Sequence, residues 1–103
     1  MASRGTNAVR VSALLKAIGH PTRLRILERI AERELCVSDL EDALGLRQPN
    51  VSQHLAVLRD RGLVIAERRG NMTCYYLADP RIAEVIALMQ DILRSEAEVE
   101  AVR

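Results

Sequence analysis

The sequence lacks large aromatic side chains and long apolar runs. Phe and Trp are absent, and Tyr75 and Tyr76 are the two aromatic residues among 103, so the core must be built from Leu, Ile, Val and Ala. No apolar run approaches the roughly 18 residues of a membrane-spanning helix, and we expect no membrane partner. With 49% hydrophobic and 28% charged residues, the composition is typical of one small globular domain.

An excess of charge of one sign is also missing, because the formal net charge is only +1. This balance excludes a broad basic field around the whole protein, but the charges are unevenly distributed. Residues 47–71 contain five arginines and two carboxylates, whereas residues 81–103 contain three arginines and five carboxylates. We therefore expect a basic surface suited to phosphates in the middle of the chain, and a different role for the last segment.

Signs of secretion and of catalysis are missing as well. Residues 1–7 have no apolar core of a signal peptide, and only two cysteines are present. We therefore expect a cytoplasmic protein whose thiols are free, reactive or metal-binding. Because the chain has no phosphate-binding glycine loop, no nucleophile elbow and no paired histidine and carboxylate at metal-ligand spacing, we do not expect an enzyme.

Apolar residues at helical spacing predict five helices, over residues 8–18, 21–32, 39–45, 48–61 and 80–97. Pro21 suits the first turn of the second helix, and we expect His20 to form a hydrogen bond at that helix start. Ser38 and Glu41 have the spacing of a capping box at the start of the third helix. Gly62 is expected to end the fourth helix.

Extended segments are predicted in two places. Residues 34–37 form a short link between the second and third helices, and residues 63–68 and 72–77 flank a turn at 69–71. The expected fold is mainly α with a small β-hairpin, a winged helix-turn-helix of order α-α-α-α-β-β-α. We expect this domain over residues 8–97, a disordered N-terminus over 1–7 and a C-terminal tail over 98–103.

The first and last predicted helices carry long aliphatic stripes. A body of this size cannot easily bury both of them. The economical solution is a homodimer through these two helices. Two-fold symmetry would then place two recognition helices about one DNA turn apart.

The fourth predicted helix has a polar edge of side chains that can read DNA. Gln and Asn can make bidentate contacts to adenine, and Ser, His and Arg can reach base edges or phosphates. This edge consists of Arg47 at the expected N-cap, Gln48, Asn50, Ser52, Gln53 and His54. The hairpin tip is expected to form a wing over the DNA backbone or minor groove, through Arg68, Arg69 and Asn71. The expected partner of both elements is double-stranded operator DNA. The structural alternatives are an ordinary solvated face for the helix and a solvated turn for the hairpin tip.

Four segments then occur in a characteristic order. They are residues 15–27 (LKAIGHPTRLRIL), 34–40 (ELCVSDL), 48–58 (QPNVSQHLAVL) and 62–64 (GLV). In this order and spacing the chain resembles the ArsR/SmtB family of small bacterial winged-helix repressors, over roughly residues 8–96. The resemblance implies a dimer that is released from operator DNA by an inducer, most often a metal or metalloid ion, sometimes an oxidant or a reactive sulfur species.

The two best-known sensing sites that this resemblance implies are incomplete here. One is a thiol cluster for arsenite or soft metals, and its three cysteine positions are occupied by Cys36, Ser38 and Glu41. The other is a zinc site on the last helix, whose positions are Asp79, Arg81, Ile92 and Ser95. Three of these four side chains do not suit Zn²⁺, and we expect no zinc site there.

Cys36 and Cys74 form the remaining candidate sensor. Cys36 lies in the extended link and Cys74 in the second wing strand, and in winged helices such a link commonly pairs with the returning strand. The two thiols can then form a disulfide or polysulfide bridge if their Cα atoms are about 4.4–6.8 Å apart, or hold a thiophilic metal or metalloid ion as a cofactor. The alternative is two small side chains that only pack.

These patterns together predict a sequence-specific DNA-binding transcriptional regulator. We expect a repressor that an inducer releases from its operator by acting on the cysteine thiols. The alternative is a winged-helix regulator without a small-molecule inducer, controlled by protein partners or acting as an interaction module.

Overall fold

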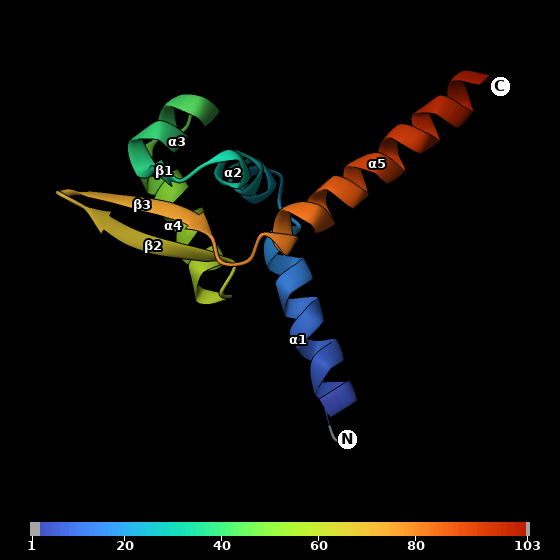
Figure 1. The fold of residues 1–103 in the computed structure, drawn as a ribbon, viewed down its shortest axis with the longest axis horizontal. Coiled ribbons are helices and arrows are strands. Elements are labelled where there is room, and N and C mark those ends of the chain that lie inside the picture. Colours follow the sequence, from blue (N-terminus) through green and yellow to red (C-terminus); the bar gives the residue numbers. More distant parts are fainter. Residues whose placement is uncertain (1–2, 103) are drawn as a thin grey trace.

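The computed structural model describes the backbone of residues 3–102 and the side chains of residues 7–96. The elements in this range are α1 Ser3–Ile18, α2 Pro21–Glu32, β1 Leu35–Cys36, α3 Val37–Leu44, α4 Gln48–Asp60, β2 Val64–Arg69, β3 Met72–Leu77 and α5 Arg81–Val102. Figure 1 shows a body made of α2, α3, α4 and the sheet, from which α1 and α5 project as two arms. This arrangement confirms the predicted winged helix-turn-helix, and the predicted link supplies a third strand.

Both arms extend beyond the predicted helices. α1 begins at Ser3, within the predicted disordered N-terminus, and α5 continues to Val102, through the predicted tail. Once a helix has formed, each further residue that is fixed adds one hydrogen bond. The last turns of α5 are also rich in Ala and Glu, which favour helices. Residues 1–2 and 103 lie outside the described residues.

An aliphatic core holds the body together, as the absence of Phe and Trp requires. The side chains of α2, α3 and α4 that meet in it are fully buried, namely Ile26, Leu27, Leu40, Val51, Leu55 and Leu58. The turn between α3 and α4 depends on Gly45, whose φ of 65° lies in the left-handed region that glycine adopts without steric cost. This turn sets the inner stripe of α4 against α2 and α3, so its other side faces outward.

The start of α3 differs from the predicted capping box. The N-cap residue is Cys36 rather than Ser38, and the backbone N–H of Cys36 donates to the Asp39 carboxylate (3.0 Å). Glu41 is therefore not the residue that reaches back to the cap. The reason is strand pairing, because β1 holds Cys36 in an extended conformation up to the residue where the helix begins.

The sheet is antiparallel, with strand order β1-β3-β2. Leu35 pairs with Tyr75, and Cys36 pairs with Cys74, which in turn pairs with Glu67. Because side chains alternate between the faces of a sheet, Leu35 and Tyr75 enter the core, and the two cysteines and Glu67 share the other face. Cys74 is only 1% exposed but is not part of the core cluster. The cysteines therefore lie on the face of the sheet opposite Leu35 and Tyr75, and Cys74 is buried there.

Apolar side chains remain exposed along both arms. They include Val11, Leu14 and Leu15 on α1, and Leu88, Met89, Ile92 and Leu93 on α5. A contiguous exposed apolar surface of this kind is typical of a protein–protein contact. None of the helices within residues 3–102 has the length and apolar character needed to cross a membrane.

Candidate DNA interface and cysteine bridge

α4 presents one polar side to solvent because its apolar residues are used on the other. Val51, Leu55 and Leu58 point into the core, so the intervening positions face outward. Arg47 is the N-cap residue, as predicted, and its side chain makes no capping hydrogen bond. In the first turn of α4, Pro49 has no N–H and the N–H of Asn50 donates to the Arg47 carbonyl (3.0 Å). The backbone N–H of Gln48 is therefore the group of this turn that suits a phosphate oxygen.

The predicted polar edge of α4 is exposed except at two residues. Arg47, Gln48, Asn50 and Gln53 are exposed, whereas Ser52 and His54 are half-buried. Gln48 Nε2 donates to Ser52 Oγ (2.9 Å). This bond orients the Gln48 amide along the helix, and it leaves the amide oxygen open to a base edge.

His54 is turned toward α2 rather than toward solvent. Arg23 Nη1 donates to His54 Nδ1 (3.3 Å), and Arg23 Nε donates to the Ala17 carbonyl (2.6 Å). The ring of His20 lies 4.6 Å from the His54 ring, centroid to centroid. His20 Nδ1 also accepts a hydrogen bond from the backbone N–H of Thr22 (3.1 Å), which confirms the role predicted for His20 at the helix start.

This environment favours the neutral form of His54. Desolvation lowers its pKa from 6.5, and the nearby charges of His20 and Arg23 lower it further. Because Arg23 is a permanent donor, His54 Nδ1 must be the acceptor. His54 therefore connects α4 to the start of α2 and, through Arg23, to the end of α1.

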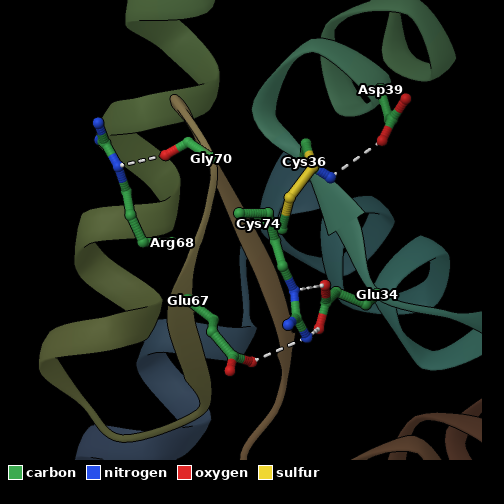
Figure 2. Close-up of a disulfide and its surroundings, with 8 residues drawn as sticks. Glu34, Cys36, Asp39, Glu67, Arg68, Gly70 and Cys74 are labelled. Atoms are coloured by element: carbon green, nitrogen blue, oxygen red, sulfur yellow. Dashed lines mark hydrogen bonds and ion pairs between the residues drawn. A yellow bond between two sulfur atoms is a disulfide. The ribbon is translucent and has the colours of Figure 1, made fainter.

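The two arginines of the wing lie in different surroundings. Arg68 Nε donates to the Gly70 carbonyl at the turn (3.3 Å), and Figure 2 shows Arg68 on the opposite side of the wing from Glu34. Arg69 is held by two carboxylates, through Nε and Nη2 to Glu34 (2.9 and 3.1 Å) and through Nη2 to Glu67 (3.1 Å). Among the residues that the structure describes, Arg68 makes no ion pair with a carboxylate. Arg68 and the exposed Asn71 are thus open to a phosphate, and Arg69 already has acidic partners.

The two cysteines are joined by a disulfide between β1 and β3, shown in Figure 2. Their Cα atoms are 3.7 Å apart, closer than the 4.4–6.8 Å usual for a disulfide. The strand pairing expected from the sequence is thus confirmed, since Cys36 and Cys74 are direct cross-strand partners. The bond connects the N-cap of α3 to the returning strand of the wing.

A metal centre is poorly supported by the same residues. Where the structure describes side chains, no three His, Cys, Asp or Glu residues gather around one point, so the cysteine pair lacks the third ligand of a closed thiolate site. Just before the last helix, the Asp79 carboxylate is occupied by Arg81, whose Nη2 donates to it (2.6 Å). Hydrogen bonds from Arg81 lower the pKa of Asp79 to about 2. These residues do not fit a metal ion.

Two residues near this site are absent from the sequence-based predictions. Glu34 contacts Arg69 across 35 positions of the chain, and Arg23 contacts His54 across 31. For Arg23 the signal was indirect: its partner His54 follows the buried Val51 by three residues and therefore lies on the flank of the core stripe. No local signal identifies Glu34, since its contact depends on the three-dimensional position of the wing.

Known proteins share this arrangement. The family model described as "Bacterial regulatory protein, arsR family" matches residues 20–66. An HTH-type transcriptional regulator of Methanocaldococcus jannaschii is 38% identical over 84 residues, which are 81% of this chain and 94% of that protein. The HTH-type transcriptional repressor SmtB of Mycobacterium tuberculosis is 42% identical over 73 residues, which are 71% of this chain and 54% of that protein.

A solved structure agrees with the fold. The homodimeric winged helix-turn-helix DNA-binding domain of Mb0332 from Mycobacterium bovis has a TM-score of 0.86 to this chain at 28% identity, covering 95% of this chain and 91% of that one. The fold and the exposed recognition helix thus define a DNA-binding transcriptional regulator. The chain belongs to the ArsR family of bacterial regulatory proteins, which confirms the resemblance. Because the family consists of regulators, the prediction that this protein is not an enzyme is also confirmed.

Proposed function

We propose that this regulator is a repressor that binds operator DNA as a homodimer in the cytoplasm and is released when Cys36 and Cys74 become oxidised to a disulfide. The observation that supports the redox control is the position of the pair. Its bond connects the N-cap of α3, next to the recognition helix, to the returning strand of the wing. A bond between the start of α3, the helix that precedes the recognition helix, and the wing can change how α4 and the wing fit the duplex together.

The DNA contacts in this proposal come from two elements. Exposed side chains at the start of α4 enter the major groove, and Arg68, Arg69 and Asn71 of the wing lie over the backbone. The exposed stripes on α1 and α5 supply the dimer contact, and the homodimeric state of the Mycobacterium bovis relative supports that assignment. A two-fold dimer presents two such interfaces to the two halves of one operator.

The mechanical step rests on how few backbone pairs join β1 to the wing. β1 pairs with β3 through two residues only, so without the disulfide the wing can change its angle relative to α3. In the oxidised form the wing is fixed to α3 and cannot follow the DNA backbone independently of α4. The disulfide form is therefore the form with low affinity for DNA.

The chemistry of the switch is thiol–disulfide exchange with a low-molecular-weight disulfide. Cys36 is half-buried and supplies the accessible sulfur, because Cys74 is 1% exposed. Deprotonated Cys36 attacks the small disulfide and releases one thiolate. The Cys74 sulfur then displaces the second thiolate from the mixed disulfide. Two protein thiols are oxidised and one small disulfide is reduced to two thiols, which take up the two protons that the protein thiols lose.

The test measures affinity for DNA in the two redox states. A duplex about 30 base pairs long, enough for two half-sites one turn apart, is selected from a random library with the reduced protein. We expect reduced protein to bind this duplex at least about fivefold more tightly than protein oxidised with glutathione disulfide, the lower end of typical allosteric coupling. The Cys36→Ser variant should bind tightly with or without the oxidant, and Cys74→Ala serves as a second variant if Cys36→Ser fails to fold.

The outcomes separate this proposal from the other candidates. Equal affinity of oxidised and reduced wild type would mean that the disulfide is structural and that the regulator has no thiol inducer. Release by arsenite in place of the oxidant, lost in Cys36→Ser, would assign the pair to a metalloid. If no sequence is enriched from the library, the chain is an interaction module rather than an operator-binding repressor.

A further inference from the structure

We propose that Glu34 competes with the DNA backbone for Arg69, and that the Cys36–Cys74 bridge keeps this carboxylate in place. The inference deepens the proposed function and rests on it, because it takes the wing to be a DNA contact. Glu34 is then a residue that tunes affinity without touching DNA. It determines how much of the positive charge of the wing is available to phosphates.

The contact itself has the geometry of a phosphate clamp. Both oxygens of Glu34 accept from Arg69, one from Nε (2.9 Å) and one from Nη2 (3.1 Å). A guanidinium binds carboxylate and phosphate oxygens in this same two-pronged way. The hydrogen bond from Arg69 lowers the pKa of Glu34, so the carboxylate is ionised at neutral pH. Glu34 thus occupies the donor groups of Arg69 that a DNA phosphate would use.

The bridge explains why Glu34 is present at the wing. Glu34 directly precedes β1, two residues before Cys36, and Cys36 is bonded to Cys74 in β3. Glu67, the second partner of Arg69, is the cross-strand neighbour of Cys74. Both acidic partners of Arg69 are therefore close in the fold to the disulfide, and Figure 2 shows Glu34 and Glu67 on the same side of the bridge.

The charges of this group cancel. Glu34 and Glu67 offset the guanidinium groups of Arg68 and Arg69, so the wing carries no net charge while Glu34 stays in place. The pair of Arg69 with Glu34 is solvent-exposed, and exposed ion pairs contribute little to stability. A phosphate can therefore displace Glu34 once the segment before β1 is released. While the bridge is closed, the tether keeps the local concentration of the carboxylate high, so displacement is less favourable.

The experiment compares Glu34→Gln with Glu32→Gln in the full-length oxidised protein. Both variants remove one exposed carboxylate, but within the described residues Glu32 makes no ion pair. On the selected duplex, between about 50 and 200 mM salt, we expect oxidised Glu34→Gln to bind about two- to fivefold more tightly than oxidised wild type. The plot of log affinity against log salt should become steeper by about 0.9, the slope for one additional phosphate contact.

A second substitution shows whether Arg69 carries the effect. In the Arg69→Gln background, Glu34→Gln should give no more gain in affinity than Glu32→Gln, because the cation for which Glu34 and phosphate compete has been removed. A gain that persists without Arg69, or an equal gain from Glu32→Gln in wild type, would overturn the proposal. This coupling is measured in the oxidised form alone. If oxidised and reduced wild type bind DNA equally, the proposed redox switch is wrong. The coupling of Glu34 to Arg69 is then still tested independently by the affinities of the Glu34→Gln and Arg69→Gln variants.

Discussion

The body and the arms are made of the same aliphatic residues, but they place them in opposite environments. In the body, leucines such as Leu55 are 0% exposed, whereas Leu93 on α5 is 65% exposed. Both belong to stripes with helical spacing. Burial in the body comes from α2, α3 and α4 packing on one another. Ala17 and Ile86, near the bases of the arms, also enter this core, but the exposed stripes farther along the arms have no such neighbour among the described residues. The comparison teaches that the body has its own core, whereas the apolar stripes of the arms stay exposed in one chain and form the proposed dimer contact.

The largest expected effect comes from a cavity in the body. Leu55→Ala removes a fully buried side chain from the centre of α4 and should lower the free energy of unfolding by about 2–5 kcal/mol. Leu93→Ala is the matched change on an arm. In dilute, monomeric protein its effect should stay within about 0.5 kcal/mol. Urea unfolding at two protein concentrations measures both, and equal losses in dilute protein would contradict the comparison.

Reduction of the disulfide is expected to have the next largest effect on the body. The bond closes a segment with a sequence separation of 38 residues, and a constraint of this size contributes about 2–4 kcal/mol by restricting the unfolded chain. Thermal unfolding with and without reductant should show this loss. The dimer dissociation constant should stay unchanged, because the bond lies between β1 and β3 and not in the arms. A dissociation constant that moved with the redox state would remove the distinction between the two regions.

A charge on an arm should affect association more than folding. Ile92→Glu places a carboxylate within the exposed stripe of α5, and its desolvation in a dimer interface should weaken association at least about tenfold. Ala87→Glu introduces the same side chain at another exposed position of α5 and serves as the control. Sedimentation equilibrium gives the dissociation constants, and circular dichroism verifies the helices. Equal weakening by both variants would indicate an effect of charge alone.

The smallest expected effect concerns the junction between the two regions, at His54. Since the pKa of His54 is lowered in the folded protein, the unfolded chain binds more protons at pH values near and just below 6.5. Stability should therefore decrease as the pH falls through this range and recover above it. His54→Gln should flatten this part of the profile. Urea titrations between about pH 5 and 8 test it, and an unchanged slope in the variant would assign the pH dependence to another group.

Much of the body could be predicted from the sequence because local patterns determine it. The stripe of Val51, Leu55 and Leu58 identifies the inner side of α4, and the pairing of the link with the wing strand brings Cys36 to Cys74. The start of α3 could not be predicted, because a capping pattern at Ser38 competes with strand pairing at Cys36. Local capping propensity favoured a helix start at Ser38, but the pairing of β1 with β3 makes Cys36 the N-cap.

The candidate site was less predictable than the fold. Gln48 and Gln53 follow from the outward side of a helix whose inner side is known. Arg69 was predicted as a wing contact to DNA, and its partner Glu34 comes from a segment 35 residues away. The periodicity of side chains along a helix or strand shows which face a residue occupies. It does not show which charged residue, distant in the sequence, lies on that face. Electrostatic contacts between elements therefore had to come from the structure.

A redox titration tests the central claim most directly. The protein is equilibrated with glutathione buffers of stepped potential, and each sample is divided between mass spectrometry, for the fraction of Cys36–Cys74 disulfide, and fluorescence anisotropy, for affinity to the selected duplex. We predict that DNA is lost along the same curve, and with the same midpoint, as the disulfide forms. Full formation of the disulfide at constant DNA affinity would contradict the account.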